Sequence, residues 1–335
     1  MKYPNWLVLV GIAGNILLVD TGKVSASIYP ELKQAEIARS YYAYSQPGEL
    51  NQTIEKYEQK FSCSQSENNA QPTHYQIWLN RGIALQQHRK YHESIVCFDR
   101  ALSINDKLEK AWYRRGISSS YLQQYSEAAI AYERAIEINP TEHTSWYNQG
   151  NAYKHLKQYN KAIFAYERAI ALKPDFHVAY YHMAKVSEMM GKYQQALAGY
   201  QKAIYLAPEY DPAWYSKGSL LSKLKQYDLA VGVYQKILKL QPEQYKAWYN
   251  LGNIYLQLED YPQAVTAYES AIALKPDYHL AWNNRGAALE AMKQIEKAIE
   301  SYNKALEYNP NYQKALNNRR RLLLSIGNNL PVSYN

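Results

Sequence analysis

The sequence has few of the residues from which catalytic and metal sites are built. Its two cysteines, Cys63 and Cys97, lack the spacing of a metal-binding motif. Its eight histidines include no H-x3-H pair on one predicted helix face. The chain also has no glycine-rich phosphate loop, no G-x-S-x-G motif and no clustered pair of carboxylates. We therefore expect no enzymatic activity, no bound metal and no cofactor.

The low cysteine count leaves two fates for these residues. A disulfide between Cys63 and Cys97 requires an oxidising compartment and a Cα separation of about 6 Å. A buried free thiol is the commoner fate, and Cys97 adjoins the apolar residue Phe98. The sequence favours the free thiol over the disulfide without excluding the latter.

Long hydrophobic runs are also scarce, because residues 6–19 form the one extended uncharged stretch. As a helix this stretch is about 21 Å long, shorter than the roughly 30 Å hydrocarbon core of a membrane. It follows Lys2 and precedes the small residues Val24-Ser25-Ala26. A basic start, a short apolar run and small residues at the cleavage site predict that residues 1–26 are a secretory signal peptide.

An uncleaved membrane anchor is the alternative for the same segment. Asp20 and Lys23 lie unusually close to the expected cleavage site, and Asn15 interrupts the apolar run. A wrongly assigned start of translation is the remaining alternative. We expect the protein to be exported (periplasm, lumen or secreted) or anchored at a membrane through residues 6–19.

The chain has more basic than acidic residues, but the basic residues are not concentrated in one segment. The formal net charge is +8, spread along the chain except for the run Arg319-Arg320-Arg321. Such a balance is compatible with an acidic partner or a nucleic acid. Because no nucleic-acid-binding motif accompanies it, we interpret it as a solvated basic surface and expect no nucleic-acid partner.

What the sequence does have is a 34-residue period. Six of the seven tryptophans lie on it, at Trp78, Trp112, Trp146, Trp214, Trp248 and Trp282, with Tyr180 at the one remaining point. We number each unit from position 1, at residues 75, 109, 143, 177, 211, 245 and 279, so that the large aromatic residue stands at position 4.

Other columns keep the same register. Position 8 is small, with Gly82, Gly116, Gly150, Ala184, Gly218, Gly252 and Gly286. Position 24 is aromatic, with Phe98, Tyr132, Tyr166, Tyr200, Tyr234, Tyr268 and Tyr302. Small residues fill position 20 and nearly all of position 27, and proline stands at position 32 in every unit but the first.

These columns resemble the tetratricopeptide repeat, a helix–turn–helix unit of 34 residues. The resemblance covers residues 75–312 as seven tandem units and implies an all-α, right-handed α-solenoid superhelix. The physics of the columns agrees with this expectation. On the first helix of a unit the large aromatic residue lies one turn from a flat spot, where another helix can approach closely. Proline at position 32 cannot continue the second helix. We therefore interpret the aromatic and alanine columns as core packing.

The segments that flank the units fit terminal roles. Residues 27–74 read as a degenerate repeat followed by a polar linker, because the tryptophan and the small residues are missing there. Residues 313–327 predict one more helix, with Arg320 at the position of the small residue. We expect this helix to be a solvating cap, followed by a tail at residues 328–335.

The candidate binding site is the inner face of the superhelix, which first-helix side chains line in the family that the sequence resembles. Position 5 is mainly tyrosine, and positions 6 and 9 are mainly polar. The candidate groove residues at or beside these positions are Asn80, Lys110, Tyr113, Arg114, Tyr147, Asn148, Asn151, Tyr181, His182, Lys185, Tyr215, Ser216, Tyr249, Asn250, Asn253 and Asn284.

The chemistry of these columns suits an extended peptide. Asparagine offers a donor and an acceptor to a peptide backbone, and tyrosine adds rigid contact area. We expect the side chains of Asn148, Asn151, Asn250 and Asn253 to face solvent, so that alanine at these positions leaves folding cooperative. The alternative interpretation is that the polar residues are merely solvated.

A narrower prediction concerns one end of the groove. Some proteins of this family hold a C-terminal carboxylate with five groove residues, and Asn80, Lys110 and Arg114 match three of them. Ala38 and Tyr42 stand where the other two belong. The match is therefore partial, although lysine and arginine would favour an anionic group at that end.

The function that this resemblance implies is non-catalytic. We expect a scaffold or assembly factor that binds a protein or peptide partner in the groove, serving a complex at the envelope or membrane. The alternative is a regulatory or substrate-delivery subunit of an enzyme, such as a glycosyltransferase, whose catalytic part is on another chain.

Overall fold

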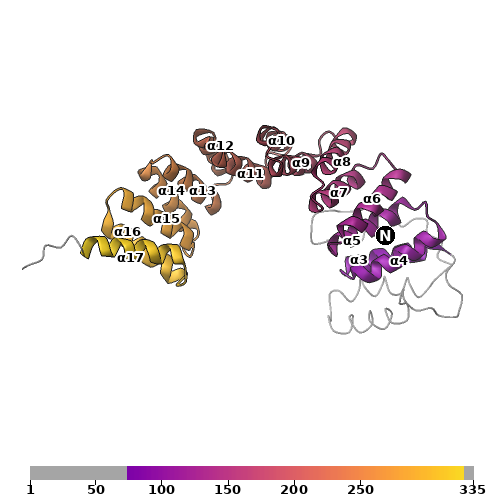
Figure 1. The fold of residues 1–335 in the computed structure, drawn as a ribbon, viewed down its shortest axis with the longest axis horizontal. Coiled ribbons are helices and arrows are strands. Elements are labelled where there is room, and N and C mark those ends of the chain that lie inside the picture. Colours follow the sequence, from indigo (N-terminus) through magenta and orange to yellow (C-terminus); the bar gives the residue numbers. More distant parts are fainter. Residues whose placement is uncertain (1–73, 328–335) are drawn as a thin grey trace, which may run out of the picture. The chain divides into compact units, whose positions relative to one another are not determined.

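The computed structural model describes residues 74–327, which form an uninterrupted series of α-helices (Figure 1). No β-strand occurs in this range, so the all-α prediction is confirmed. Each unit contributes two helices. The first helices are α3 (Tyr75–Gln87), α5 (Glu109–Tyr121), α7 (His143–His155), α9 (His177–Met189), α11 (Asp211–Lys223), α13 (Tyr245–Gln257) and α15 (His279–Ala291). The second helices are α4 (Tyr91–Ile104), α6 (Tyr125–Ile138), α8 (Tyr159–Leu172), α10 (Tyr193–Leu206), α12 (Tyr227–Leu240), α14 (Tyr261–Leu274) and α16 (Ile295–Tyr308).

The turn between the two helices of a unit is set by position 15, which has a positive φ in every unit. The residues there are Arg89, Gln123, Lys157, Gly191, Lys225, Glu259 and Lys293. The next backbone N–H donates to the carbonyl of position 11, as from Gln158 to Tyr153 at 2.9 Å. This bond closes the left-handed motif that often ends α-helices. Gly191, with φ of 75°, is the one residue among these for which the left-handed conformation has no Cβ penalty.

Within a unit, the small residue at position 8 lies against the aromatic ring at position 24. A Cβ added to Gly150 would lie 2.7 Å from the Tyr166 ring, and one added to Gly252 would lie 2.7 Å from the Tyr268 ring. Tyr166 and Tyr268 are fully buried. The small residue at position 8, expected to allow close approach, therefore provides the space that the position-24 ring occupies.

The fourth unit packs differently at the same level. Ala184 replaces glycine at position 8, and glycine replaces the bulkier residues of other units at position 23. A Cβ added to this Gly199 would lie 2.8 Å from the Ala184 Cβ and 3.3 Å from the Tyr180 carbonyl oxygen. The methyl group of Ala184 thus occupies the space that the side chain at position 23 takes elsewhere.

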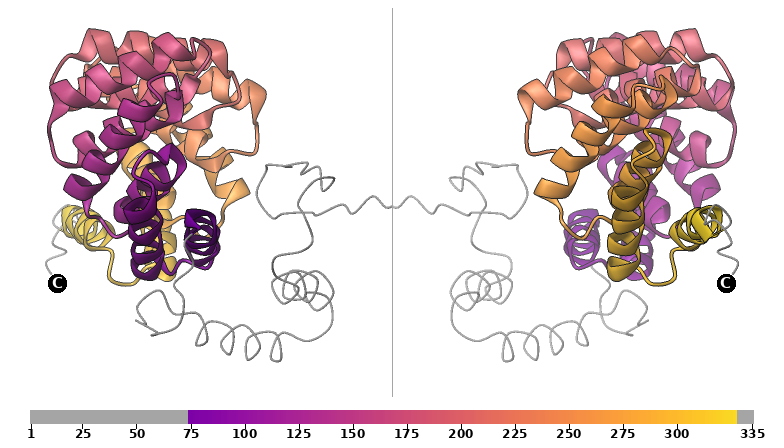
Figure 2. Two further views of the ribbon diagram at one scale, coloured as in Figure 1. Left: turned by 90° about the vertical axis from the view of Figure 1, so that its right-hand side faces the viewer. Right: turned by 90° about the vertical axis from the view of Figure 1, so that its left-hand side faces the viewer.

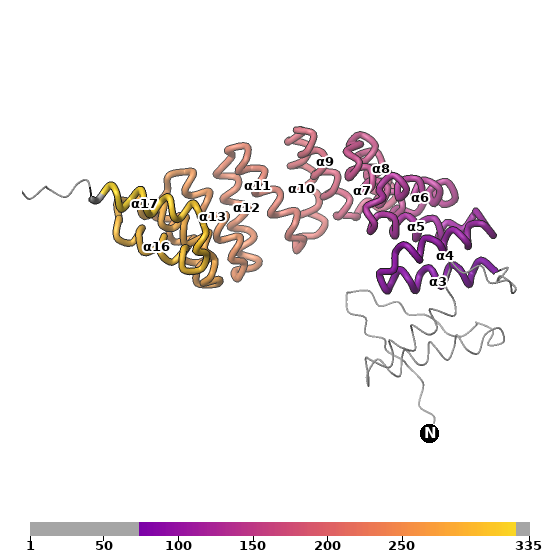
Figure 3. The backbone as a smooth tube through the Cα atoms, turned by 60° about the horizontal axis from the view of Figure 1, so that its bottom comes forward, coloured from indigo at the N-terminus to yellow at the C-terminus, as the bar shows by residue number. Residues whose placement is uncertain are grey.

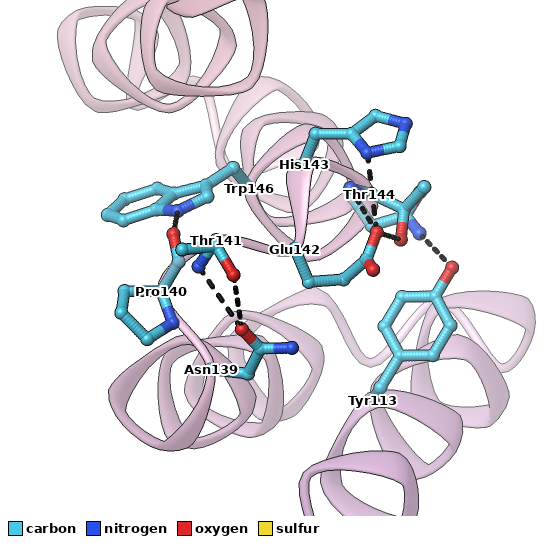
Figure 4. Close-up of polar contacts among 9 residues, drawn as sticks. Tyr113, Asn139, Pro140, Thr141, Glu142, His143, Thr144 and Trp146 are labelled. Carbon is cyan, nitrogen blue, oxygen red and sulfur yellow. Dashed lines mark hydrogen bonds and ion pairs between the residues drawn. The ribbon is translucent and has the colours of Figure 1, made fainter. Parts of the chain in front are cut away.

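Successive units are joined through the tryptophan at position 4. Its indole N–H donates to the carbonyl of position 32 in the preceding unit, as from Trp146 to Pro140 at 2.9 Å (Figure 4). Trp112, Trp214, Trp248 and Trp282 make the same bond at 2.7–3.0 Å. The proline that ends one unit therefore supplies the acceptor that positions the next.

The junction drawn in Figure 4 has an additional acidic cap. Glu142 Oε1 accepts from the backbone N–H of Thr144 at 3.2 Å and from its hydroxyl at 2.8 Å. Burial would raise the pKa of Glu142, but these two bonds and the charges of His143 and Lys173 together outweigh it, and the pKa is lowered. A carboxylate at the start of α7 satisfies a free backbone N–H and complements the helix dipole.

The helix pairs stack in chain order and change direction from one pair to the next (Figures 2 and 3). Several pairs of successive first helices, such as α5 and α7, also contact each other directly.

A further helix, α17 (Gln313–Gly327), packs on α16. Its buried residues are Ala315 and Leu322, whereas Leu323 is exposed, as is Arg320 at position 8. Arg321 forms an ion pair with Glu290 at 2.8 Å. A polar, arginine-rich outer face is what the cap was expected to present.

Several predicted segments lie outside the described residues. These are the signal peptide at residues 1–26, nearly all of the degenerate repeat and linker at residues 27–74, and the tail at residues 328–335. Cys97 is fully buried in α4 and is disulfide-bonded, so the expectation that favoured a free thiol at this residue is wrong. Cys63 lies outside the described range. Within residues 74–327, no helix combines the length and the apolar character needed to cross a membrane. The same range holds no group of three or more histidine, cysteine or acidic residues arranged to bind a metal ion.

Candidate peptide-binding face of the first helices

Positions 5, 6, 9 and 12 of the first helices form a connected strip, which we name the inner strip. Hydrogen bonds join these positions along the stack. Asn148 donates to the hydroxyl of Tyr113 in the preceding unit at 3.1 Å, and Asn284 donates to that of Tyr249 at 3.2 Å. Asn284 also donates to Asn253 at 2.8 Å. The structure thus brings predicted groove residues of neighbouring units into direct contact.

The tyrosines at position 5 are fixed by ring packing. Tyr113, Tyr147, Tyr181, Tyr215 and Tyr249 each lie 5.9–6.1 Å, centroid to centroid, from the position-24 tyrosine of their unit. Tyr147, Tyr181 and Tyr249 also meet an aromatic ring at position 34, at 5.1–5.4 Å. Ring clusters of this kind leave the tyrosines little rotational freedom, so their exposed parts form a rigid surface.

The fifth unit differs in its position-5 tyrosine, Tyr215. The Tyr215 hydroxyl is buried without a hydrogen-bond partner among the described residues. Burial, together with the nearby Asp211 and Tyr245, raises the pKa of Tyr215 to about 12. The neighbouring Ser216 and the next unit's Asn250 are half-buried on the same strip.

In five units the buried hydroxyl at position 24 is hydrogen-bonded within the unit, to the residue at position 9 or at position 12. Tyr166 donates to Asn151 and Tyr268 donates to Asn253, both at position 9 and both at 2.8 Å. At position 12, Glu290 accepts from the hydroxyl of Tyr302 at 2.8 Å. Glu188 likewise accepts from the hydroxyl of Tyr200, and Ser120 shares a hydrogen bond with the hydroxyl of Tyr132 in which either oxygen can donate. Units with an asparagine at position 9 have no serine or carboxylate at position 12.

This arrangement corrects the expectation for the four asparagines. Asn148, Asn151, Asn250 and Asn253 are half-buried rather than turned freely to solvent. Asn151 and Asn253 accept from buried tyrosine hydroxyls, so alanine there would leave a buried donor without a partner. The sequence could not reveal this, because the direction of the tyrosine hydroxyl depends on how the two helices pack.

The residues expected to hold a terminal carboxylate are partly engaged elsewhere. Asn80 and Lys110 are exposed, and Asn80 accepts from Gln76 at 3.1 Å. Arg114 donates to the buried Gln86 at 3.1 Å, and its Nε is buried without a partner among the described residues. The Arg114 guanidinium is thus directed toward the preceding unit.

An acidic group lies close to Lys110. Burial, and then the nearby Glu142, raise the pKa of Glu109, while Lys110 lowers it. Lys110 therefore interacts with the carboxylate of Glu109 in this chain. This neighbour weakens the attraction that Lys110 offers to an added anion.

The inner strip also holds cationic residues that the sequence reading did not select. Lys154, at position 12 of α7, lies near the predicted groove residues His182 and Lys185 of α9. His155, at position 13, stacks on Tyr125 of the preceding unit. Burial lowers the pKa of His182 to about 4, assisted by the charges of Lys154, His155 and Lys185. The prediction stopped at position 9, and extending it by one helical turn would have found Lys154.

Comparison with known proteins supports the repeat assignment over most of the chain. Family models described as tetratricopeptide repeat match residues 109–142, 143–176, 245–278 and 279–312. Two further models with the same description match residues 75–108 and 211–244, and residues 178–210. A search of curated proteins finds no match.

Solved structures share the fold at low sequence identity. The C-terminal part of a TPR repeat-containing protein from Cytophaga hutchinsonii is 19% identical, with a TM-score of 0.65, over 72% of this chain and 98% of that one. A tetratricopeptide repeat protein from Parabacteroides merdae is 15% identical, with a TM-score of 0.52, over 74% and 98%. YrrB, described as a TPR protein with an unusual peptide-binding site, is 24% identical, with a TM-score of 0.49, over 57% and 99%.

Proposed function

Because the chain belongs to the tetratricopeptide repeat family, whose arrays are protein- and peptide-interaction domains, we propose that it is a non-catalytic scaffold that binds an extended segment of a partner protein along the inner strip. The observation that carries the proposal is the continuity of the strip across units. Tyr113 with Asn148, and Tyr249 with Asn284, repeat the same tyrosine–amide contact in different parts of the array. An extended peptide would meet the same tyrosine–amide chemistry at these two levels of the strip.

The rigidity of the strip favours binding. Tyrosine rings that are already packed lose little conformational freedom when a ligand covers them. Asn148 donates one amide N–H to Tyr113, which leaves its second N–H and its amide oxygen for a peptide backbone. Such contacts hold a backbone without depending on its sequence, so specificity has to come from groups that vary between units.

The test blocks the strip without removing a contact that stabilises the fold. Ser219, at position 9 of α11, is exposed and has no hydrogen-bond partner among the described residues. We expect Ser219→Arg to lose partner proteins that the full chain retains from native extract. Leu229→Arg is the matched control, because Leu229 is 61% exposed on α12 of the same unit. Retention of the same partners by Ser219→Arg as by the unmodified chain would contradict the proposal.

The cellular location is part of the proposal. The apolar run at residues 6–19, preceded by Lys2, supports export or anchoring at a membrane. Mass spectrometry of the mature N-terminus separates the two, since cleavage after Ala26 indicates a signal peptide and an intact N-terminus in the membrane fraction indicates an anchor. Intact Met1 on protein from the cytoplasmic fraction would contradict both.

A further inference from the structure

Basic side chains gather at one level of the inner strip, between α7 and α9. They are Lys154 near the end of α7, and His182 and Lys185 on α9; His155 follows Lys154, and its ring stacks on Tyr125 of the preceding unit. Burial, followed by the charge of Lys185, lowers the pKa of Lys154. The four groups are therefore close enough to influence one another across the two helices.

The negative charge at this level is too small to balance them. Glu188 is the carboxylate that faces the cluster, and its Oε2 accepts from Lys185 at 3.2 Å and from the Tyr200 hydroxyl at 2.5 Å. Lys154 has no hydrogen-bond partner or ion pair within residues 74–327. One positive charge on the inner strip thus remains uncompensated.

The reason lies in the way the third unit satisfies its buried tyrosine. The residue at position 12 is hydrogen-bonded to the hydroxyl of the position-24 tyrosine in the second, fourth and seventh units. In the third unit Asn151 accepts from Tyr166 instead, which leaves the residue at position 12 free of that role. A lysine occupies it, whereas the other units have Gln86, Ser120, Glu188, Ser222, Leu256 and Glu290 at this position.

The surroundings would strengthen a contact with an anion. The His182 ring lies 5.7 Å from the Tyr147 ring and 5.0 Å from the Tyr181 ring, centroid to centroid. Neither ring nitrogen has a hydrogen-bond partner among the described residues, so a neutral His182 retains one free N–H donor. Partly buried charges interact more strongly than exposed ones because less water screens them.

We propose that Lys154 and His182 form a subsite for an aspartate or glutamate side chain of the bound peptide, with Lys185 adding positive charge at its edge. This inference rests on the proposed function, because it assigns a preferred residue type to one level of the strip. The subsite lies at the third and fourth of seven units, where a peptide continues in both directions. It therefore takes an internal side chain and is separate from the residues expected to hold a terminal carboxylate.

The experiment selects peptides that bind the full chain from a displayed library of random decapeptides flanked by constant sequence at both ends. We expect aspartate or glutamate to be enriched at one position among binders that Ser219→Arg loses. Lys154→Gln should abolish that enrichment. Lys161→Gln is the control, because it removes the same charge from an exposed site on α8 of the same unit.

One selected peptide then gives the quantitative test. Changing its acidic residue to the amide should weaken binding about tenfold to the unmodified chain, as expected for the loss of one charge-assisted hydrogen bond, and hardly at all to Lys154→Gln. Binding of the acidic peptide should also raise the pKa of His182, measured by NMR.

Two other outcomes would contradict the subsite, and they can be told apart. Binders that depend on the strip but show no acidic preference, or keep it in Lys154→Gln, would overturn the subsite and leave the proposed function intact. An absence of any binder that Ser219→Arg loses would overturn the proposed function, and the subsite with it.

Discussion

The exchange of residues in the fourth unit gives a sharp test of the packing. Ala184 and Gly199 face each other where other units place glycine against a larger residue. The perturbation is Gly199→Ala, which introduces a Cβ 2.8 Å from the Ala184 Cβ and 3.3 Å from the Tyr180 carbonyl oxygen. Both distances are shorter than ordinary van der Waals contact, so the two helices have to separate.

The magnitude follows from comparison with a second glycine. Gly232 lies on α12, the second helix of the next unit, and a Cβ added there meets nothing within 4 Å. Both substitutions gain the same backbone preference of alanine for a helix, about 1 kcal/mol. Gly232→Ala should therefore stabilise the protein. Gly199→Ala should be less stable than Gly232→Ala by about 1–3 kcal/mol, the usual cost of overpacking.

The assay is thermal and urea unfolding of the full chain, followed by circular dichroism. Adding Ala184→Gly to Gly199→Ala should recover most of the loss, because it restores the arrangement of the other units. A coupling energy near zero in this double-mutant cycle, or equal effects of Gly199→Ala and Gly232→Ala, would refute the reasoning.

Three further results are expected. Asn151→Ala should cost about 1–3 kcal/mol by leaving the Tyr166 hydroxyl without an acceptor, and Tyr166→Phe in the same chain should relieve much of that cost in an unfolding assay. At the turn, Gly191→Ala should cost about 1 kcal/mol through its φ of 75°, whereas Lys157→Gly, at a φ of 59°, should raise the melting temperature; the opposite order would contradict the turn geometry. Because the pKa of His182 is lowered to about 4, below the unfolded value of about 6.5, its contribution to stability is present above pH 6.5 and is lost as the pH falls toward 4. Melting temperatures of His182→Asn should consequently fall less over that range than those of the unmodified chain.

The sequence predicted those features that depend on residue size and period. The 34-residue columns located the helix pairs, and the small residue at position 8 marked the seat of the ring at position 24, as at Gly150 and Tyr166. Such features are local, because helix geometry alone fixes which residues share a face. The exchange between Ala184 and Gly199 is also visible in the sequence, but only when positions 8 and 23 of a unit are compared together.

The candidate site was less predictable, because hydrogen bonds depend on direction as well as on residue type. An asparagine on the inner strip is equally suited to solvent, to a ligand and to a buried hydroxyl, and the packing of Tyr166 and Tyr268 decides the matter for Asn151 and Asn253. The free charge of Lys154 follows from the same choice. Whether a lysine at position 12 is compensated depends on which residue its neighbouring tyrosine uses as acceptor.

The central claim is that an extended partner segment lies along the inner strip, and crosslinking tests it most directly. A photoreactive amino acid is placed in the full chain at exposed positions of the strip, in place of Asn80 or Ser219, and at Leu229 on the second helix as a control. Crosslinked partners from native extract are identified and their attachment sites mapped. We predict that the two strip positions capture separate sites within one continuous segment of the same partner, and that position 229 does not. Capture of that partner only from position 229 would contradict the account.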